Sequence, residues 1–163
     1  MIDMPTLLAR LDAGRISYEL FEHAPVFNMA EARALERPHP EAEAKNLFVR
    51  DDKKRRYFLL TVQAEKHVDL QRFRVEHGLR RLSFASAEDL HALLSLIPGA
   101  VTPFGLLNDE ARRVEFFLDS DFLKPGALIG LHPNSNTATV FLKTEALVSF
   151  LASAGVRTSA ARF

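Results

Sequence analysis

A lysine at the start of an apolar run is the first group in this chain that could do chemistry. Lys45 opens the segment KNLFVR, where a strand is expected to begin. An ammonium held at the mouth of a pocket can engage a phosphate or a carbonyl oxygen. The same lysine can equally lay its stem along a sheet and extend its charge into water. The segment alone leaves both interpretations open.

The second unusual segment is PGAVTPFGLLND, residues 98–109. Two glycines and two prolines within its first eight residues predict a rigid, irregular turn. Glycine also lets a backbone approach a ligand closely. The alternative is a tight connection between a helix and a strand, with no ligand.

The sequence has none of the common catalytic or metal-binding motifs. There is no GxSxG elbow, no Walker phosphate loop, no GxGxxG and no HExxH. The six histidines are scattered without metal-ligand spacing, and the chain has no cysteine, which excludes thiolate sites and disulfides. We therefore expect neither a metal nor a cofactor.

Helices and strands are interspersed along the chain. Capping residues and apolar spacing predict helices at 4–13, 69–77, 86–96 and from a cap at Thr144. Apolar runs predict strands at 16–20, 45–50, 57–62, 81–84, around 103–107, and at 114–118, 127–131 and 138–142.

Two pairs of these strands should form hairpins, one with the charged tip DDKKRR and one around HPNSN, while the tail VRTSAARF should be loose. This order favours an α+β fold: a single domain over residues 1–163 with a mixed, largely antiparallel sheet flanked by helices.

Charge is unevenly distributed. The net charge is zero, but residues 1–44, 45–81 and 82–163 carry −4, +6 and −2. A concentrated basic face guides a phosphate backbone, although a solvated surface gives the same pattern. No apolar run is long enough to span a membrane and the start does not resemble a signal peptide, so we expect a cytoplasmic protein with no membrane partner.

Taken together, the segments match a family. The order KNLFVRD, YFLLTV, RLSFASAEDL, PGAVTPFGLLND and HPNSNTATVFL resembles the YbaK-type editing domains, from about Leu7 to Leu151. It is most similar to the free-standing alanyl-tRNA(Pro) deacylases, the ProXp-ala or PrdX group, which are related to the insertion domain of bacterial prolyl-tRNA synthetase. The resemblance implies a mixed sheet flanked by helices with a pocket at one side. It also implies a trans-editing hydrolase that deacylates Ala-tRNA(Pro) and spares Pro-tRNA(Pro).

The resemblance also implies a set of site residues. Lys45 is the catalytic residue, and the substrate-binding positions are Asn46, Gly99, Thr102, Pro103, Phe104, Gly105, His132 and Asn136. Met29 and Leu47 are further candidates for the pocket wall, or else plain core. The expected partners are the acceptor end of tRNA(Pro), with Arg80 or Arg81 on its stem and Arg80 the stronger candidate, and a prolyl-tRNA synthetase.

The mechanism that the resemblance suggests is substrate-assisted. The neighbouring ribose hydroxyl helps to activate water, backbone amides of the loop from Gly99 to Gly105 take the developing charge, and Lys45 fixes the terminal phosphate or the carbonyl. No residue is a dedicated general base, and His132 is expected to orient. Three alternatives stay open: a deacylase for cysteine or serine, a non-catalytic module that binds tRNA or a synthetase, and a small-molecule binder, which the basic segment disfavours.

Overall fold

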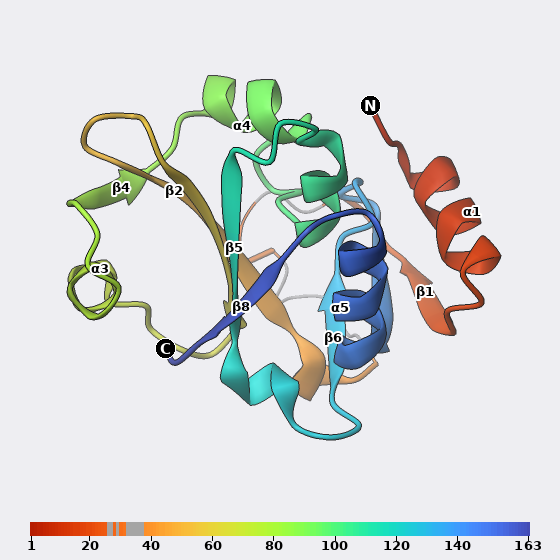
Figure 1. The fold of residues 1–163 in the computed structure, drawn as a ribbon. Helices are drawn as coiled ribbons and strands as arrows, with labels where there is room; N and C mark the ends of the chain where they lie inside the picture. The colour runs from red at the N-terminus through yellow and green to blue at the C-terminus, as the bar shows by residue number, and fades with distance from the viewer. Residues whose placement is uncertain (26–27, 29, 32–37) are drawn as a thin grey trace.

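The computed structural model describes residues 1–25, 28, 30–31 and 38–163 (Figure 1). Met29, one of the two candidates for the pocket wall, lies outside these described residues. The described strands form two sheets, one of five strands and one of three. None of the helices within the described residues has the length and apolar character needed to span a bilayer.

The larger sheet has the strand order β4-β2-β3-β5-β8. The hairpin predicted around DDKKRR is confirmed, since β2 (Ala44–Asp51) and β3 (Tyr57–Gln63) pair antiparallel. The short strand β4 (Leu82–Phe84) pairs antiparallel with the outer edge of β2. On the other side, β5 (Val114–Asp119) runs parallel to β3, and β8 (Thr158–Ala161) runs parallel to β5.

The smaller sheet is antiparallel throughout, with the order β1-β7-β6. Its strands are β1 (Tyr18–Glu22), β6 (Leu128–Leu131) and β7 (Ala138–Lys143), and the predicted hairpin around HPNSN joins the last two. A single parallel bridge between Glu43 and Gly130 brings the start of β2 beside β6.

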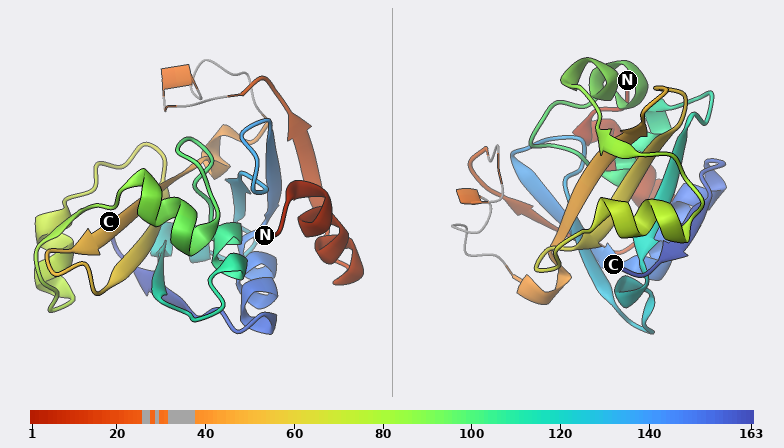
Figure 2. Two further views of the ribbon diagram at one scale, coloured as in Figure 1. Left: turned by 90° about the horizontal axis from the view of Figure 1, so that it is seen from above. Right: turned by 90° about the vertical axis from the view of Figure 1, so that its left-hand side faces the viewer.

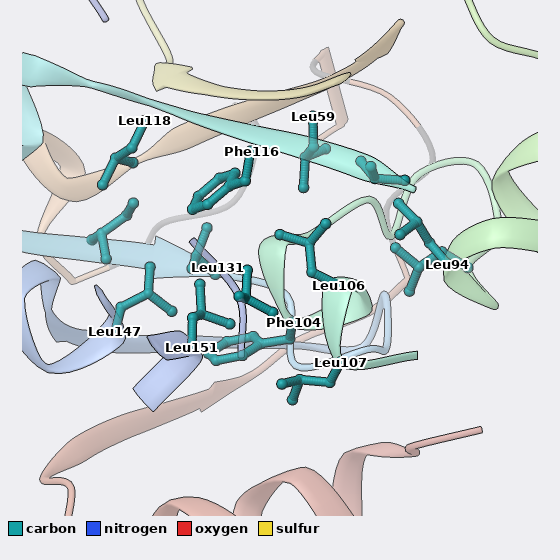
Figure 3. Close-up of a cluster of buried hydrophobic side chains, with 14 of the residues drawn as sticks. Leu59, Leu94, Phe104, Leu106, Leu107, Phe116, Leu118, Leu131, Leu147 and Leu151 are labelled. Carbon is teal, nitrogen blue, oxygen red and sulfur yellow. The ribbon is translucent and has the colours of Figure 1, made fainter. Parts of the chain in front are cut away.

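Helices cover both faces of the larger sheet. The α-helices of the described residues are α1 (Met4–Ala13), α3 (Leu70–Glu76), α4 (Ala87–Leu94) and α5 (Thr144–Ser153). Three 3-10 turns also lie in these residues: η1 (Pro40–Ala42), η2 (Pro103–Asn108) and η3 (Ser120–Leu123). One core lies between the larger sheet, the smaller sheet, α1, α4, α5 and η2, and Figure 3 shows Phe104 and Leu106 of η2 within it. A second core lies on the opposite face of the larger sheet, against α3.

Four of the six pairings among the described strands are antiparallel, which confirms the predicted α+β fold with a mixed sheet. Three local predictions were wrong. The segment PFGLL is the 3-10 turn η2 and not a strand, because Pro103 fixes a helical first position. Lys143, and not Thr144, precedes the last helix, and no side chain caps it. The tail is not loose, because β8 completes the edge of the larger sheet.

Candidate active site

Strand β2 places the predicted site residues on two faces of the larger sheet. Side chains alternate along a strand. Phe48 packs in the core with α4 and η2, whereas Val49 packs in the core with α3. Asn46 therefore shares the first face, and Lys45 and Leu47 share the second. The sequence neighbours Lys45 and Asn46 consequently point in opposite directions.

Lys45 is half-buried at the beginning of β2, opposite Val62 of β3. Its ammonium donates a hydrogen bond to the main-chain carbonyl oxygen of Lys66, in the connection between β3 and α3. A second contact defines this connection, because the amide of Ala64 donates to the carbonyl of Glu43 at 3.0 Å. The cation is therefore held at a fixed point beside the start of β2.

The carbonyl that holds Lys45 belongs to a residue that is itself anchored. The Lys66 ammonium lies 2.9 Å from a carboxylate oxygen of Asp119 and 2.6 Å from one of Asp121. Asp119 is fully buried at the end of β5, and it also accepts hydrogen bonds from the amides of Gln63 at 3.1 Å and Asp121 at 3.0 Å. These contacts fasten the β3–α3 connection to β5.

The pKa shifts of Lys66 and Asp121 also favour the ion pair between them. Burial acts to lower the pKa of Lys66, but the hydrogen bonds to Asp121 and Asp119 outweigh burial and raise the pKa above its ordinary value. The hydrogen bond from Lys66 likewise lowers the pKa of the Asp121 carboxyl. Lys66 and Asp121 therefore both stay charged across the neutral range.

A pocket of about 220 Å³ opens at the edge of β2, where pairing with β4 ends. Its walls come from β2, from the β4–α4 segment and from the loop after α4: Asn46, Leu47, Phe48, Phe84, Ala85, Ser86, Ala87, Leu90, Pro98, Gly99 and Val101. The structure thus brings three of the predicted substrate-binding residues together, namely Asn46, Leu47 and Gly99. Asn46 is oriented by the Thr61 hydroxyl, which donates to its side-chain oxygen at 2.5 Å.

The loop after α4 divides into an exposed part and a buried part. Gly99 has a φ of +87°, a conformation that favours glycine, and it lines the pocket. Thr102, Pro103, Phe104 and Gly105 are buried behind the pocket and do not line it. A Cβ added to Gly105 would lie 2.5 Å from a side-chain carbon of Leu96, so this glycine serves close packing.

Hydrogen bonds within the loop reduce the number of backbone amides that could serve as oxyanion donors. The Phe104 amide donates to the Thr102 hydroxyl oxygen at 3.4 Å, and the Gly105 amide donates to the Thr102 carbonyl at 3.0 Å. The Ala100 amide donates to the carbonyl of Ile97 at 3.1 Å. These three amides are therefore unsuited to receive a developing oxyanion, which corrects that part of the prediction. The amides of Gly99 and Val101 remain as candidates, because these two residues line the pocket and the buried Thr102 does not.

His132 lies at the end of β6, in the smaller sheet. Its Nδ1 donates to the carbonyl of Ala138 at 3.1 Å, which places the ring proton on Nδ1. Its ring lies 6.2 Å from the ring of His23, whose Nε2 is 3.0 Å from the hydroxyl of the buried Thr139. Asn136 lies in the same β6–β7 turn. Neither His132 nor Asn136 lines the pocket beside β2, and their roles stay predictions.

Basic side chains gather at the tip of the β2–β3 hairpin and beside β4. We call Lys53, Lys54, Arg55, Arg80 and Arg81 the basic ridge. Arg80 makes two hydrogen bonds to the Asp52 carboxylate, which joins the hairpin tip to the chain entering β4. Arg81 makes no ion pair to any residue that the structure describes. Both arginines are exposed, so the ridge is available to a polyanion.

Sequence reasoning missed Lys66, Asp119 and Phe84. An acidic residue that closes the apolar strand VEFFLD was a signal for Asp119, because a buried carboxylate requires partners. Phe84 belonged to a strand that was predicted, but nothing in the sequence indicated that its ring is 63% exposed. No signal indicated that the Lys66 carbonyl meets Lys45.

Comparisons with known proteins show the family to which the chain belongs. The family model of the aminoacyl-tRNA editing domain matches residues 23–150. A prolyl-tRNA editing protein ProX from Acetoanaerobium sticklandii is 39% identical over 141 residues, covering 86% of this chain and 85% of the relative. A prolyl-tRNA synthetase associated domain-containing protein 1 from Bos taurus is 34% identical over 153 residues, covering 90% and 86%.

A solved structure described as a candidate trans-editing enzyme for prolyl-tRNA synthetase shares the fold, with a TM-score of 0.65 at 17% identity, covering 98% of this chain and 96% of the other. The predicted resemblance to the editing domains is confirmed. On its match over residues 23–150, the chain belongs to the aminoacyl-tRNA editing domain family.

Proposed function

We propose that the chain, with residues 1–163 acting as one domain, is a trans-editing deacylase that hydrolyses Ala-tRNA(Pro) and spares Pro-tRNA(Pro). Membership of the editing family and the similarity to ProX support the reaction and the tRNA. The observation that carries the proposal is the Lys45 ammonium, which is held on the Lys66 carbonyl at the start of the strand that also lines the pocket.

The reaction asks for little covalent chemistry from the protein. The aminoacyl bond is an activated ester, so its hydrolysis needs a positioned water and stabilisation of an oxyanion. In this proposal Lys45 contacts the terminal phosphate or the ester carbonyl, the Gly99 and Val101 amides are the candidate oxyanion donors, and the neighbouring ribose hydroxyl helps to activate water. His132 orients a substrate group.

Editing is required because a synthetase cannot reject a smaller amino acid strongly. A pocket built for proline gains only a few kcal/mol over alanine, and a second site that admits the smaller residue alone supplies the remaining discrimination. Alanine is the amino acid that the resemblance to the free-standing alanyl-tRNA(Pro) deacylases implies. Cysteine and serine are the alternatives that the same site could accept.

The acceptor end of tRNA(Pro) would reach the site past the basic ridge. Arg80 forms an ion pair with Asp52, and this ion pair is exposed, so exchanging the carboxylate for a phosphate costs little. Arg81 is available without such an exchange. A prolyl-tRNA synthetase is the second proposed partner, and the cytoplasm, where tRNA is charged, is the proposed location.

The test is deacylation of alanyl-, prolyl-, cysteinyl- and seryl-tRNA(Pro) side by side under single-turnover conditions. We expect rapid hydrolysis of the alanyl ester and little of the prolyl ester. Equal rates on these two esters would exclude the proposal, since such an enzyme would destroy correctly charged tRNA. Faster hydrolysis of the cysteinyl or seryl ester than of the alanyl ester would show that the enzyme is specific for that amino acid and not for alanine.

A further inference from the structure

Phe84, the last residue of β4, is a large aromatic side chain left 63% exposed at the wall of the pocket. Among the exposed large apolar residues described, it is the only aromatic one. We propose that Phe84 is a stacking platform for an unpaired base at the acceptor end of the RNA. This inference rests on the proposed function, because it assumes that the ligand is an acceptor stem with a single-stranded end.

Register places Phe84 on the same face of the sheet as the proposed catalytic lysine. Phe84 pairs with Val49 of β2, and directly opposed residues of antiparallel strands share a face. Lys45 and Leu47 lie on that face too, by alternation along β2. Val49 lies four positions after Lys45, which at roughly 3.3 Å per residue is about 13 Å.

The basic ridge lies further along the same strand, beyond Asp51 where β2 enters the hairpin tip. Figure 2 (right) shows β4, the hairpin tip and α3 on this side of the molecule. A substrate aligned with β2 would therefore meet the ridge, then Phe84, then Lys45. A duplex with a single-stranded 3′ end presents phosphates, unpaired bases and the reactive ester in this order.

Stacking suits the chemistry of this position. Unpaired bases are commonly bound on aromatic faces, and stacking tolerates any base because every base has a π-face. The cations of the ridge complement the phosphates that accompany such a base. Neighbouring pocket residues Ala85 and Ala87 are small, which leaves room beside the Phe84 ring.

The first experiment uses an alanylated RNA microhelix with the sequence of the tRNA(Pro) acceptor stem and its unpaired 3′ end. Single-turnover rates are measured against enzyme concentration for the wild type and for Phe84→Ala, Phe84→Leu and Phe84→Tyr. We expect the half-saturating enzyme concentration to rise about tenfold for Phe84→Ala and Phe84→Leu, because both variants lose the aromatic ring. We expect Phe84→Tyr to have the half-saturating concentration of the wild type, because it keeps an aromatic ring. The rate at saturation should be the same in all three variants.

The matched control is Val75→Ala. Val75 is also exposed, at 64%, but it lies on α3 and does not line the pocket. We expect no change in half-saturation for this variant. Thermal unfolding of each variant separates a binding defect from a folding defect, and an exposed ring contributes little to the core, so all variants should unfold near the wild-type temperature.

The second experiment identifies the base. Each unpaired nucleotide is replaced in turn by an abasic one, in the wild type and in Phe84→Ala. We expect one position at which the abasic substitution and the protein substitution are not additive, because each removes the same stack. Additive losses at every position would overturn the proposal, as would a Phe84→Leu variant that binds like the wild type.

Two further outcomes are distinguishable. If Phe84→Ala binds the microhelix normally but loses affinity for prolyl-tRNA synthetase, the ring serves a protein partner and the inference is wrong. If the wild type hydrolyses none of the charged tRNAs, the proposed function fails, and binding of the uncharged microhelix to the same variants still tests the stack.

Discussion

The ammonium of Lys45 is bonded to the main-chain carbonyl of Lys66, 21 positions further along the chain. Lys66 is in turn held by the carboxylates of Asp119 and Asp121, which come from the end of β5 and the η3 turn. The position of the proposed catalytic cation therefore depends on two acidic residues from a distant part of the sequence.

Removing the ammonium should slow deacylation without unfolding the protein. We expect Lys45→Ala to reduce the single-turnover rate on the order of a hundredfold, or about 3 kcal/mol, because an oriented charge that strengthens in the transition state is lost. Lys45→Arg should also be slow, since a guanidinium is larger and forked. Thermal unfolding is the control, and a Lys45→Ala variant with near-normal rates would remove Lys45 from the mechanism.

Asp119→Asn should lower both stability and rate. The substitution removes one of the two carboxylate oxygens that accept the amides of Gln63 and Asp121, and an unpaired buried amide costs about 1–3 kcal/mol of unfolding free energy, which denaturant unfolding measures. The rate should fall as well, because the Lys66 ammonium would keep only Asp121 and the Lys66 carbonyl would be held less firmly. In a Lys45→Ala background the same substitution should have no further effect on the rate.

Asp121 supplies the comparison for Asp119. It contacts the same ammonium but is half-exposed, so Asp121→Asn should lower the unfolding free energy less than Asp119→Asn does. If Asp119→Asn slows the Lys45→Ala variant as strongly as it slows the wild type, Asp119 does not act through Lys45.

The contribution of the Lys66–Asp121 pair to stability should be confined to a window of pH. The Asp121 pKa is lowered from 3.8, so the stabilisation is present above that value and is lost as the pH falls through the folded-state pKa. The Lys66 pKa is raised from 10.5, so the stabilisation is present below that value and is lost as the pH rises through the folded-state pKa.

The measurement is the difference in unfolding free energy between the wild type and Lys66→Met as a function of pH. We expect a plateau from about pH 5 to pH 9 and a smaller difference at both extremes. A difference that does not change across the acidic limb would show that the charges of this pair do not contribute.

The basic ridge should control the salt dependence of RNA binding. We expect at least one of Arg80→Ala and Arg81→Ala to weaken binding of tRNA(Pro), with Arg80→Ala the stronger candidate, and each lost phosphate contact to reduce the slope of log affinity against log salt by about one. Asp52→Ala should do the opposite and tighten binding, because it releases Arg80 and removes a negative charge from the ridge. If both arginine variants keep the wild-type affinity and slope, the RNA lies on another face.

Local signals in the sequence were sufficient for much of the fold. Asp3 and Ser86 cap helices as their sequence contexts indicate, and Asp69, which was predicted to lie within a helix, caps one; each accepts a hydrogen bond from an amide of the first turn. The hairpin between β2 and β3 also depends on neighbouring residues alone. Strand β8 could not be predicted in this way, because TSAA is a poor strand sequence that is stabilised by parallel pairing with the distant β5.

The candidate site, like the fold, could be predicted from the sequence only in part. Three residues predicted from motifs, Asn46, Leu47 and Gly99, do line one pocket. The four residues from Thr102 to Gly105 belong to the same motif but are buried behind it, because their order alone does not tell which backbone atoms bond to one another. Asp119 acts at Lys45 only through Lys66, and a pattern of residue types does not record such an indirect contact.

The ion pair between Arg50 of β2 and Asp89 of α4 has a consequence for the speed of substrate capture. It joins two walls of the pocket, and both side chains are largely shielded from solvent. Because this ion pair connects the two walls directly, we expect no rearrangement between them when RNA associates. Capture should then follow a single kinetic phase whose rate rises linearly with RNA concentration, limited by diffusion and by the orientation of the acceptor end.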